Sequence, residues 1–178
     1  MNEQMQGEDP QFHKLLKSAT TAVKTIMDCY RQASRTRGTD LVKVDYENPR
    51  CFVPLEDMYV GAIATAFLTF KECSATSEQR HFFRLRCLDF YIESIEQILK
   101  RVPFRESTLS NLEFLDPIVA RTRSAPSAAP LARAFPNVIS GESLQSLDTK
   151  WRILRNIDLD IRTEAILHEF WGSVFRLR

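Results

Sequence analysis

Along most of the chain, apolar residues recur every three or four positions, the spacing that places them on one face of an α-helix. Only five glycines interrupt the 178 residues, and no segment shows the repeated apolar and polar alternation that is typical of strands. The pattern therefore predicts an all-α, irregular multi-helix domain, which can divide into two packed helical lobes.

The first third of the chain predicts two helices joined by a proline-punctuated connection. After a flexible start over residues 1–8, Asp9 is a suitable N-cap for a helix that ends before Gly38. A short extended piece is expected at 41–44, and a second helix over about 55–72.

A long central helix is predicted over about 78–102, with Ser77 as its cap and Pro103 as its end. Its apolar arc is broad, which predicts packing on more than one side. Arginines crowd its first turns, where the helix dipole favours acids. We expect these arginines to form a solvated edge, and a contact with phosphates is the alternative. The residues concerned are Arg80, Arg84 and Arg86.

The segment 121–136 is the most irregular part of the chain, with three prolines and many small residues. It is the expected connection between a main helical lobe at 9–120 and C-terminal helices at 137–178 that pack back on that lobe. Within the last region, one apolar face is expected along 144–154 and a final helix over 161–175.

Composition limits the partners. Lys and Arg number 24 against 23 Asp and Glu, so the net charge of +1 gives no overall attraction to nucleic acid or anionic lipid. No apolar run approaches the roughly 18 residues of a membrane span, and the start of the chain lacks the pattern of a secretory signal, so an intracellular protein without membrane contact is expected. The scattered cysteines predict buried free thiols rather than a zinc site; they are Cys29, Cys51, Cys73 and Cys87.

Motifs for chemistry are weak. The sequence holds no phosphate-binding glycine loop, no nucleophile elbow and no zinc-protease motif, so we expect no enzyme activity of this chain and assign no catalytic, cofactor or metal residue. Three scattered histidines are expected to be exposed or capping. Two sets of residues allow a functional and a structural reading. The acids near 160 suit a divalent cation or a helix cap, and Trp151 suits a nucleic-acid base or the core. The histidines and acids are His13, His81, His168, Asp158, Asp160 and Glu164.

Several phrases in a fixed order resemble one family. They cover roughly residues 53–171 and read FVPLEDMYVG (52–61), RCLDFYIESIEQILKRVPF (86–104), LEFLDPIVA (112–120), LARAFP (131–136), LDTKWRIL (147–154) and EFW (169–171). This succession resembles the region before the C-terminal end of hAT-superfamily transposases, the hobo and Activator group, and of the animal genes domesticated from them.

The resemblance implies that the chain is similar to the helical insertion domain of such transposases. Their catalytic Asp, Asp and Glu lie in the flanking ribonuclease-H-like fold, so no catalytic residue is carried over to this sequence. The matched positions are implied to be structural anchors, and they are Tyr59, Gly61, Phe90, Tyr91, Ile95, Phe114, Trp151 and Trp171.

The expected function is therefore that of a non-catalytic helical interaction domain in a domesticated or fragmentary, nuclear, transposase-derived protein. A protein partner or self-association is expected, with no cofactor and no small-molecule substrate. The alternative is direct contact with transposon-end or chromosomal DNA, and an unrelated helical scaffold that resembles the family by chance is a third possibility. The DNA alternative would use Arg80, Arg84, Arg86, Arg121, Arg123, Lys150, Arg152 and Arg155.

Overall fold

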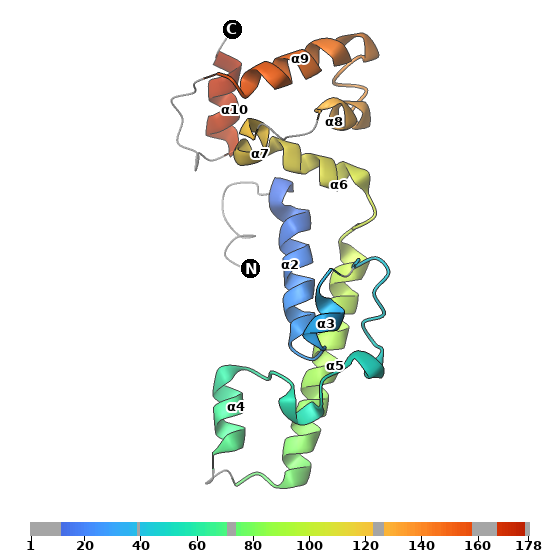
Figure 1. Ribbon diagram of the computed structural model, residues 1–178, viewed down its shortest axis with the longest axis vertical. Helices are drawn as coiled ribbons and strands as arrows, with labels where there is room; N and C mark the ends of the chain where they lie inside the picture. The colour runs from blue at the N-terminus through green and yellow to red at the C-terminus, as the bar shows by residue number, and fades with distance from the viewer. Residues whose placement is uncertain (1–11, 39, 71–73, 123–126, 158–166, 177–178) are drawn as a thin grey trace. The chain divides into compact units, whose positions relative to one another are not determined.

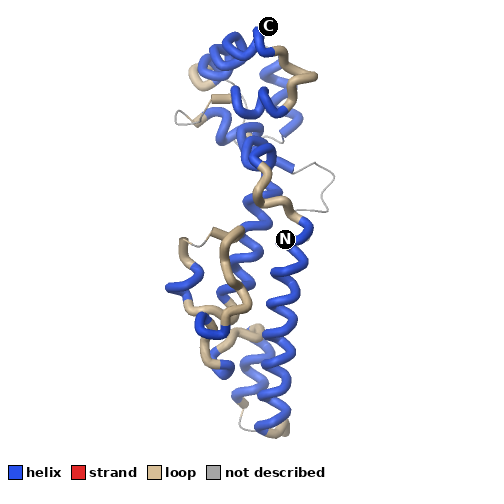
Figure 2. Tube along the Cα trace, turned by 90° about the vertical axis from the view of Figure 1, so that its right-hand side faces the viewer, coloured by secondary structure: helices blue, strands red, loops and turns tan. Residues whose placement is uncertain are grey.

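A computed structural model describes residues 12–38, 40–70, 74–122, 127–157 and 167–176. These residues form helices and connections, and none of them belongs to a strand, although Arg31 and Phe52 make one isolated antiparallel bridge (Figures 1 and 2). The predicted all-α class is confirmed.

The chain forms two compact units. We call residues 17–105 the central unit, and residues 1–16 with 106–178 the terminal unit. The division falls after Arg105 and not within 121–136, where the connection between lobes was expected. The reason is that Ala120, just before the proline-rich stretch, and Ala128, inside it, lie in the same buried core as Trp151.

The central unit is built on two helices that run antiparallel, α2 and α5 (Figure 1). Val23 and Met27 of α2 and Ile95 of α5 are completely buried in one core. Their four-residue spacing on α2 explains why one face of that helix is covered. The elements of this unit are α2 (Leu15–Asp28), α3 (Ala33–Thr36), the 3-10 turns η2 (Pro49–Cys51) and η3 (Leu55–Asp57), α4 (Ala62–Thr69) and α5 (Ser77–Arg101).

The connection between α2 and α4 is held to the end of α2 by Tyr30. The buried Tyr30 ring packs edge-on against Phe52, with ring centroids 5.1 Å apart, and its hydroxyl donates to the Tyr46 carbonyl at 2.9 Å. The next residue, Arg31, is also buried and donates to the Asp45 carbonyl at 2.6 Å. The backbone makes a further hydrogen bond between the two segments, in which the Val53 amide donates to the Tyr30 carbonyl.

A capping box starts α5. The Thr76 hydroxyl accepts from the Gln79 amide, and the Gln79 side chain accepts from the Thr76 amide, so two unpaired amides of the first turn are satisfied. The cap is therefore Thr76, one residue before the expected Ser77. The helix ends at Arg101, before Pro103, against a predicted end at 102.

Three local expectations in the central unit were wrong. The first helix ends at Asp28, where the chain turns to bury Tyr30, and α3 follows as a separate short helix; Asp9 lies outside the described residues. Residues 41–43 form a turn instead of an extended piece. The helix expected over 55–72 is broken at Gly61, which has a φ of 96°.

The terminal unit has a core of its own around an aromatic stack. Trp151, which is 6% exposed, stacks on Trp171 with ring centroids 6.1 Å apart, and Phe170 packs edge-on against Trp171. The indole Nε1 of Trp171 donates to the Leu115 carbonyl at 2.8 Å. The elements are η1 (Phe12–Lys14), α6 (Ser107–Leu112), η4 (Glu113–Leu115), α7 (Pro117–Arg121), α8 (Ala129–Ala134), η5 (Gly141–Ser143), α9 (Leu144–Leu154) and α10 (Leu167–Arg176).

His13 was expected to be exposed or to cap a helix, and it is buried, with 4% of its surface exposed. Its Nε2 lies 3.9 Å from the carboxylate of Asp116, the residue that caps α7. Burial lowers the pKa of His13 in spite of this nearby carboxylate, so the neutral imidazole is favoured. His81 and His168 are exposed.

Replacement of Ile95 by Ala is expected to lower the free energy of unfolding by about 2–5 kcal/mol, because a fully buried side chain leaves a cavity in the central core. The matched control on the same helix is Phe90→Ala, which removes a side chain that is 67% exposed and should change stability by about 0.5 kcal/mol or less. Urea titrations of the full chain measure both. Equal losses in the two variants would contradict this assignment of the core face.

Candidate protein-interaction surface

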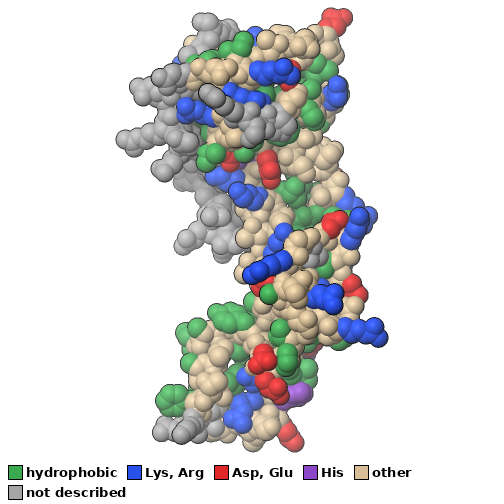
Figure 3. Space-filling view, in the orientation of Figure 1, with side chains coloured by type: hydrophobic (Ala, Val, Ile, Leu, Met, Phe, Trp, Pro, Cys, Tyr) green, Lys and Arg blue, Asp and Glu red, His purple; other side chains and the backbone are tan. Residues whose placement is uncertain are grey.

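An apolar helix, α4, lies outside both cores. The sequence YVGAIATAFLTF, residues 59–70, carries no charge, yet no residue of α4 is buried and none belongs to the central core. A helix that is apolar on all sides is normally covered by other protein. Figure 3 shows hydrophobic side chains at the surface in the region of α4. This helix therefore presents apolar surface that the described residues of the chain do not cover.

One stripe of α4 is especially exposed. Ile63 and Phe67 are four residues apart on one side of α4, and Phe70, the residue that caps the end of the helix, follows three residues later. Their exposed fractions are 89%, 59% and 65%. Three large apolar side chains in a row exceed the scattered single residues that are normal on a protein surface. Such a row is typical of helices that dock into a partner.

Gly61 sets the start of α4. Its φ of 96° and ψ of 144° belong to a region that side-chain-bearing residues rarely adopt, and no atom would contact an added Cβ. The glycine is required by the backbone turn and not by close packing.

The outer face of α5 adds two further phenylalanines. Phe82 is 64% exposed and Phe90 is 67% exposed, whereas Ile95 on the opposite face is fully buried. Phe90 is thus no core anchor, which corrects the expectation. The periodicity indicated a broad apolar arc, but the central core covers only the side of α5 that carries Ile95. We call Ile63, Phe67, Phe70, Phe82 and Phe90 the aromatic surface.

Tyr91 of α5 contacts both Tyr59, just before α4, and the buried Tyr30. The Tyr91 hydroxyl donates to the Tyr59 carbonyl at 2.9 Å, and the Tyr91 ring stacks on Tyr30. The Tyr59 side chain itself is exposed, so this residue anchors the chain through its backbone and not through its ring. The other anchors that the resemblance implied, Phe114 and Trp171, are partly buried in contact with the terminal core.

The basic residues that were candidates for DNA contact are divided between the two units. In the central unit Arg80 and Arg84 are half-buried, and the exposed Arg86 lies 3.7 Å from the carboxylate of Asp89. In the terminal unit Arg121 and Arg155 are half-buried, and each has an interaction partner. Arg123 lies outside the described residues.

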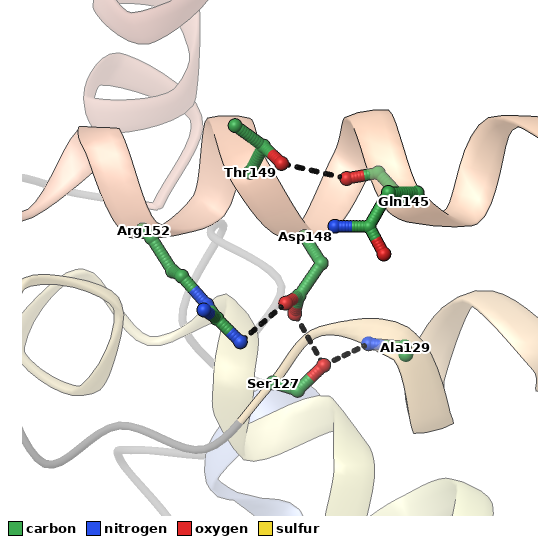
Figure 4. A network of polar contacts seen from close by, with 6 residues as sticks. All are labelled: Ser127, Ala129, Gln145, Asp148, Thr149 and Arg152. Carbon is green, nitrogen blue, oxygen red and sulfur yellow. Dashed lines mark hydrogen bonds and ion pairs between the residues drawn. The ribbon is translucent and has the colours of Figure 1, made fainter.

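Arg152 takes part in a local polar network (Figure 4). Its guanidinium lies 3.0 Å from the Asp148 carboxylate, and the same carboxylate accepts a hydrogen bond from the Ser127 hydroxyl. Ser127 in turn accepts from the Ala129 amide at 3.1 Å, at the start of α8. The network joins α9 to α8, so Arg152 has a structural role in this unit.

Lys150 lies at an apolar pocket of about 500 Å³ in the terminal unit. The pocket is lined by Trp151, Trp171 and Phe175, together with aliphatic residues of α9 and α10. Lys150 is the one charged residue among the described residues that line it. The lining suits an apolar group and offers no pair of titratable groups for acid–base catalysis.

The described residues offer little support for a metal site or a reactive nucleophile. They hold no group of three potential His, Cys, Asp or Glu metal ligands, and the acids at 158, 160 and 164 lie outside them. Cys29, Cys51 and Cys87 are free thiols, half-buried instead of fully buried as expected. Burial raises the pKa of Cys29 and Cys87, which disfavours the reactive thiolate. Cys73 is outside the described range.

Among the helices that the structure describes, none combines the length and the apolar character that crossing a bilayer requires.

Sequence reasoning missed Ile63, Phe67, Phe70 and Phe82 as functional candidates. The signal that could have found them is the lack of charge over residues 59–70. A strongly apolar helix is normally covered by other protein, and no residue of α4 is buried.

Replacement of Gly61 by Ala is expected to destabilise the central unit by about 1–3 kcal/mol, because alanine is strained at a φ of 96°. The same replacement at Gly172, inside α10, meets no atom within 4 Å and should stabilise the terminal unit by about 0.5–1 kcal/mol. Hydrogen exchange resolved by peptide measures each unit separately. Unchanged protection of the central unit in Gly61→Ala would refute the backbone requirement.

Comparison with protein-family models, with curated proteins and with solved structures finds no match to this chain.

Proposed function

We propose that this chain is a non-catalytic helical interaction domain that binds protein through the aromatic surface. The observation that carries the proposal is α4, a helix without charge whose residues are all absent from the two cores. Burying a large apolar side chain is worth about 1.5–3 kcal/mol relative to leaving it in water. Three such residues on one stripe give a partner several kcal/mol of binding free energy.

The resemblance to hAT transposases extends the proposal. On this view the domain belongs to a transposase-derived nuclear protein in which the helical insertion serves assembly. The ordered phrases from residue 52 to residue 171 support this origin. The alternative of direct DNA contact has less support, because Arg152 is held by the Asp148 carboxylate within its own unit.

The interaction is tested by a photo-crosslinking amino acid placed at Phe67 in the full chain, expressed in cells. We expect discrete protein adducts from this position, and we expect Ile63→Asp in the same chain to remove them, since a charge in the stripe opposes burial. The control position is Lys43, an exposed residue of the central unit away from α4. The circular dichroism melt of Ile63→Asp should match that of the unsubstituted chain, because Ile63 makes no core contact.

Two results would mean that α4 is not a specific binding surface. One is that crosslinkers at positions 43 and 67 capture the same proteins, and the other is that Ile63→Asp leaves the adducts at position 67 unchanged.

A further inference from the structure

The apolar pocket of the terminal unit lies where α9 meets α10. Its volume of about 500 Å³ falls within the range of about 300–1,000 Å³ that is typical of small-molecule sites. Trp151 of α9 and Trp171 of α10 both line it, and their rings stack with centroids 6.1 Å apart. Such a combination of aromatic walls and one polar group is common in sites that hold a ligand.

The aromatic walls are held in place by contacts outside the pocket. The indole Nε1 of Trp171 donates to the Leu115 carbonyl at 2.8 Å, and the buried Trp151 ring packs edge-on against Phe114. Neither Leu115 nor Phe114 is among the described residues that line the pocket. The two rings are therefore fixed by the fold itself, which lowers the cost of ordering them when a ligand binds.

Lys150 gives the pocket an uncompensated positive charge. It is exposed and is the one charged residue among the described residues of the lining. The single acid of α9, Asp148, points instead to Ser127 and Arg152 (Figure 4). None of the ion pairs between described residues includes Lys150. An anionic group at this position would therefore meet a lysine that has no competing carboxylate.

We propose that the pocket binds a small amphipathic anion, an aliphatic chain that ends in a carboxylate. The chain lies against the tryptophans and the aliphatic residues, where each buried methylene contributes to binding. The carboxylate accepts from the ammonium of Lys150. Because an exposed lysine keeps its ammonium on the solvent side of an apolar surface, this ion pair forms without burial of either charge. The site is separate from the aromatic surface, which belongs to the other unit.

The lining also disfavours other classes of ligand. It holds no acid among its described residues, so a cationic head group meets only the like charge of Lys150. A ligand with hydroxyls along its length, such as a sugar, would bury them against apolar side chains without hydrogen-bond partners. Ile153 and Phe175, which are 51% and 72% exposed, leave apolar surface at the pocket that an aliphatic chain can cover.

Binding can be followed at the site itself, because Trp151 and Trp171 are the only two tryptophans of the chain. The intrinsic fluorescence of the full chain is titrated with octanoate, 1-octanol and octylammonium, which share one aliphatic chain and differ in the charge of the head group. We expect octanoate to change the emission saturably and to bind more tightly than octylammonium. Hydrogen exchange resolved by peptide should show added protection in α9 and α10 and none in α4.

The role of the charge is tested by Lys150→Gln. This variant should bind octanoate about threefold more weakly, as expected for the loss of an exposed ion pair, and should bind 1-octanol as the unsubstituted protein does. The matched control is Lys14→Gln, which removes an exposed lysine of the same unit that does not line the pocket and should leave the affinity for octanoate unchanged.

Three results would overturn this inference. One is that octanoate gives no saturable change, and another is that Lys150→Gln weakens octanoate and 1-octanol equally or leaves both unchanged. The third is that Lys14→Gln weakens octanoate as much as Lys150→Gln does. A photo-crosslinker at Phe175 that captures protein in cells, together with no response to octanoate, would assign the pocket to a protein partner instead.

Discussion

The burial of Tyr30 at the end of α2 is the contact on which the central unit depends. Its ring lies between Phe52 and Tyr91, and its hydroxyl donates to the Tyr46 carbonyl. Burial raises the pKa of Tyr30 to about 12, so the hydroxyl keeps its proton and remains a donor at physiological pH. With Arg31 bound to the Asp45 carbonyl, this one junction ties the whole connection after α2 to the pair formed by α2 and α5.

After this junction, the chain follows the core as far as Val60. Met58 is buried and Val60 packs against the core, but the chain leaves it at Gly61 through a backbone conformation that glycine adopts without strain. The helix that follows, α4, carries no charge, and none of its residues is buried. The candidate surface lies on α4 because no residue of this helix belongs to the core.

The two faces of α5 differ in burial although both carry large apolar residues. Ile95 faces the core, while Phe90, five residues earlier, faces solvent. In the terminal unit the charged residues serve local structure, as Asp148 does by joining Ser127 and Arg152. Charge counted along the sequence does not show such ionic partners, since they lie on neighbouring turns and segments.

The sequence by itself determined the helical class, the bounds of α5 to within one residue and the buried positions Ile95 and Trp151, because hydrogen bonding, capping and apolar period are local properties of a helix. It could not determine that Phe90 is exposed, that His13 is buried or that Ala120 and Ala128 share one core. Periodicity indicates that a face is apolar, and only the tertiary structure decides which apolar faces meet another element. For Ile63 and Phe67 no such element exists among the described residues, and that absence of cover is what makes α4 a candidate surface.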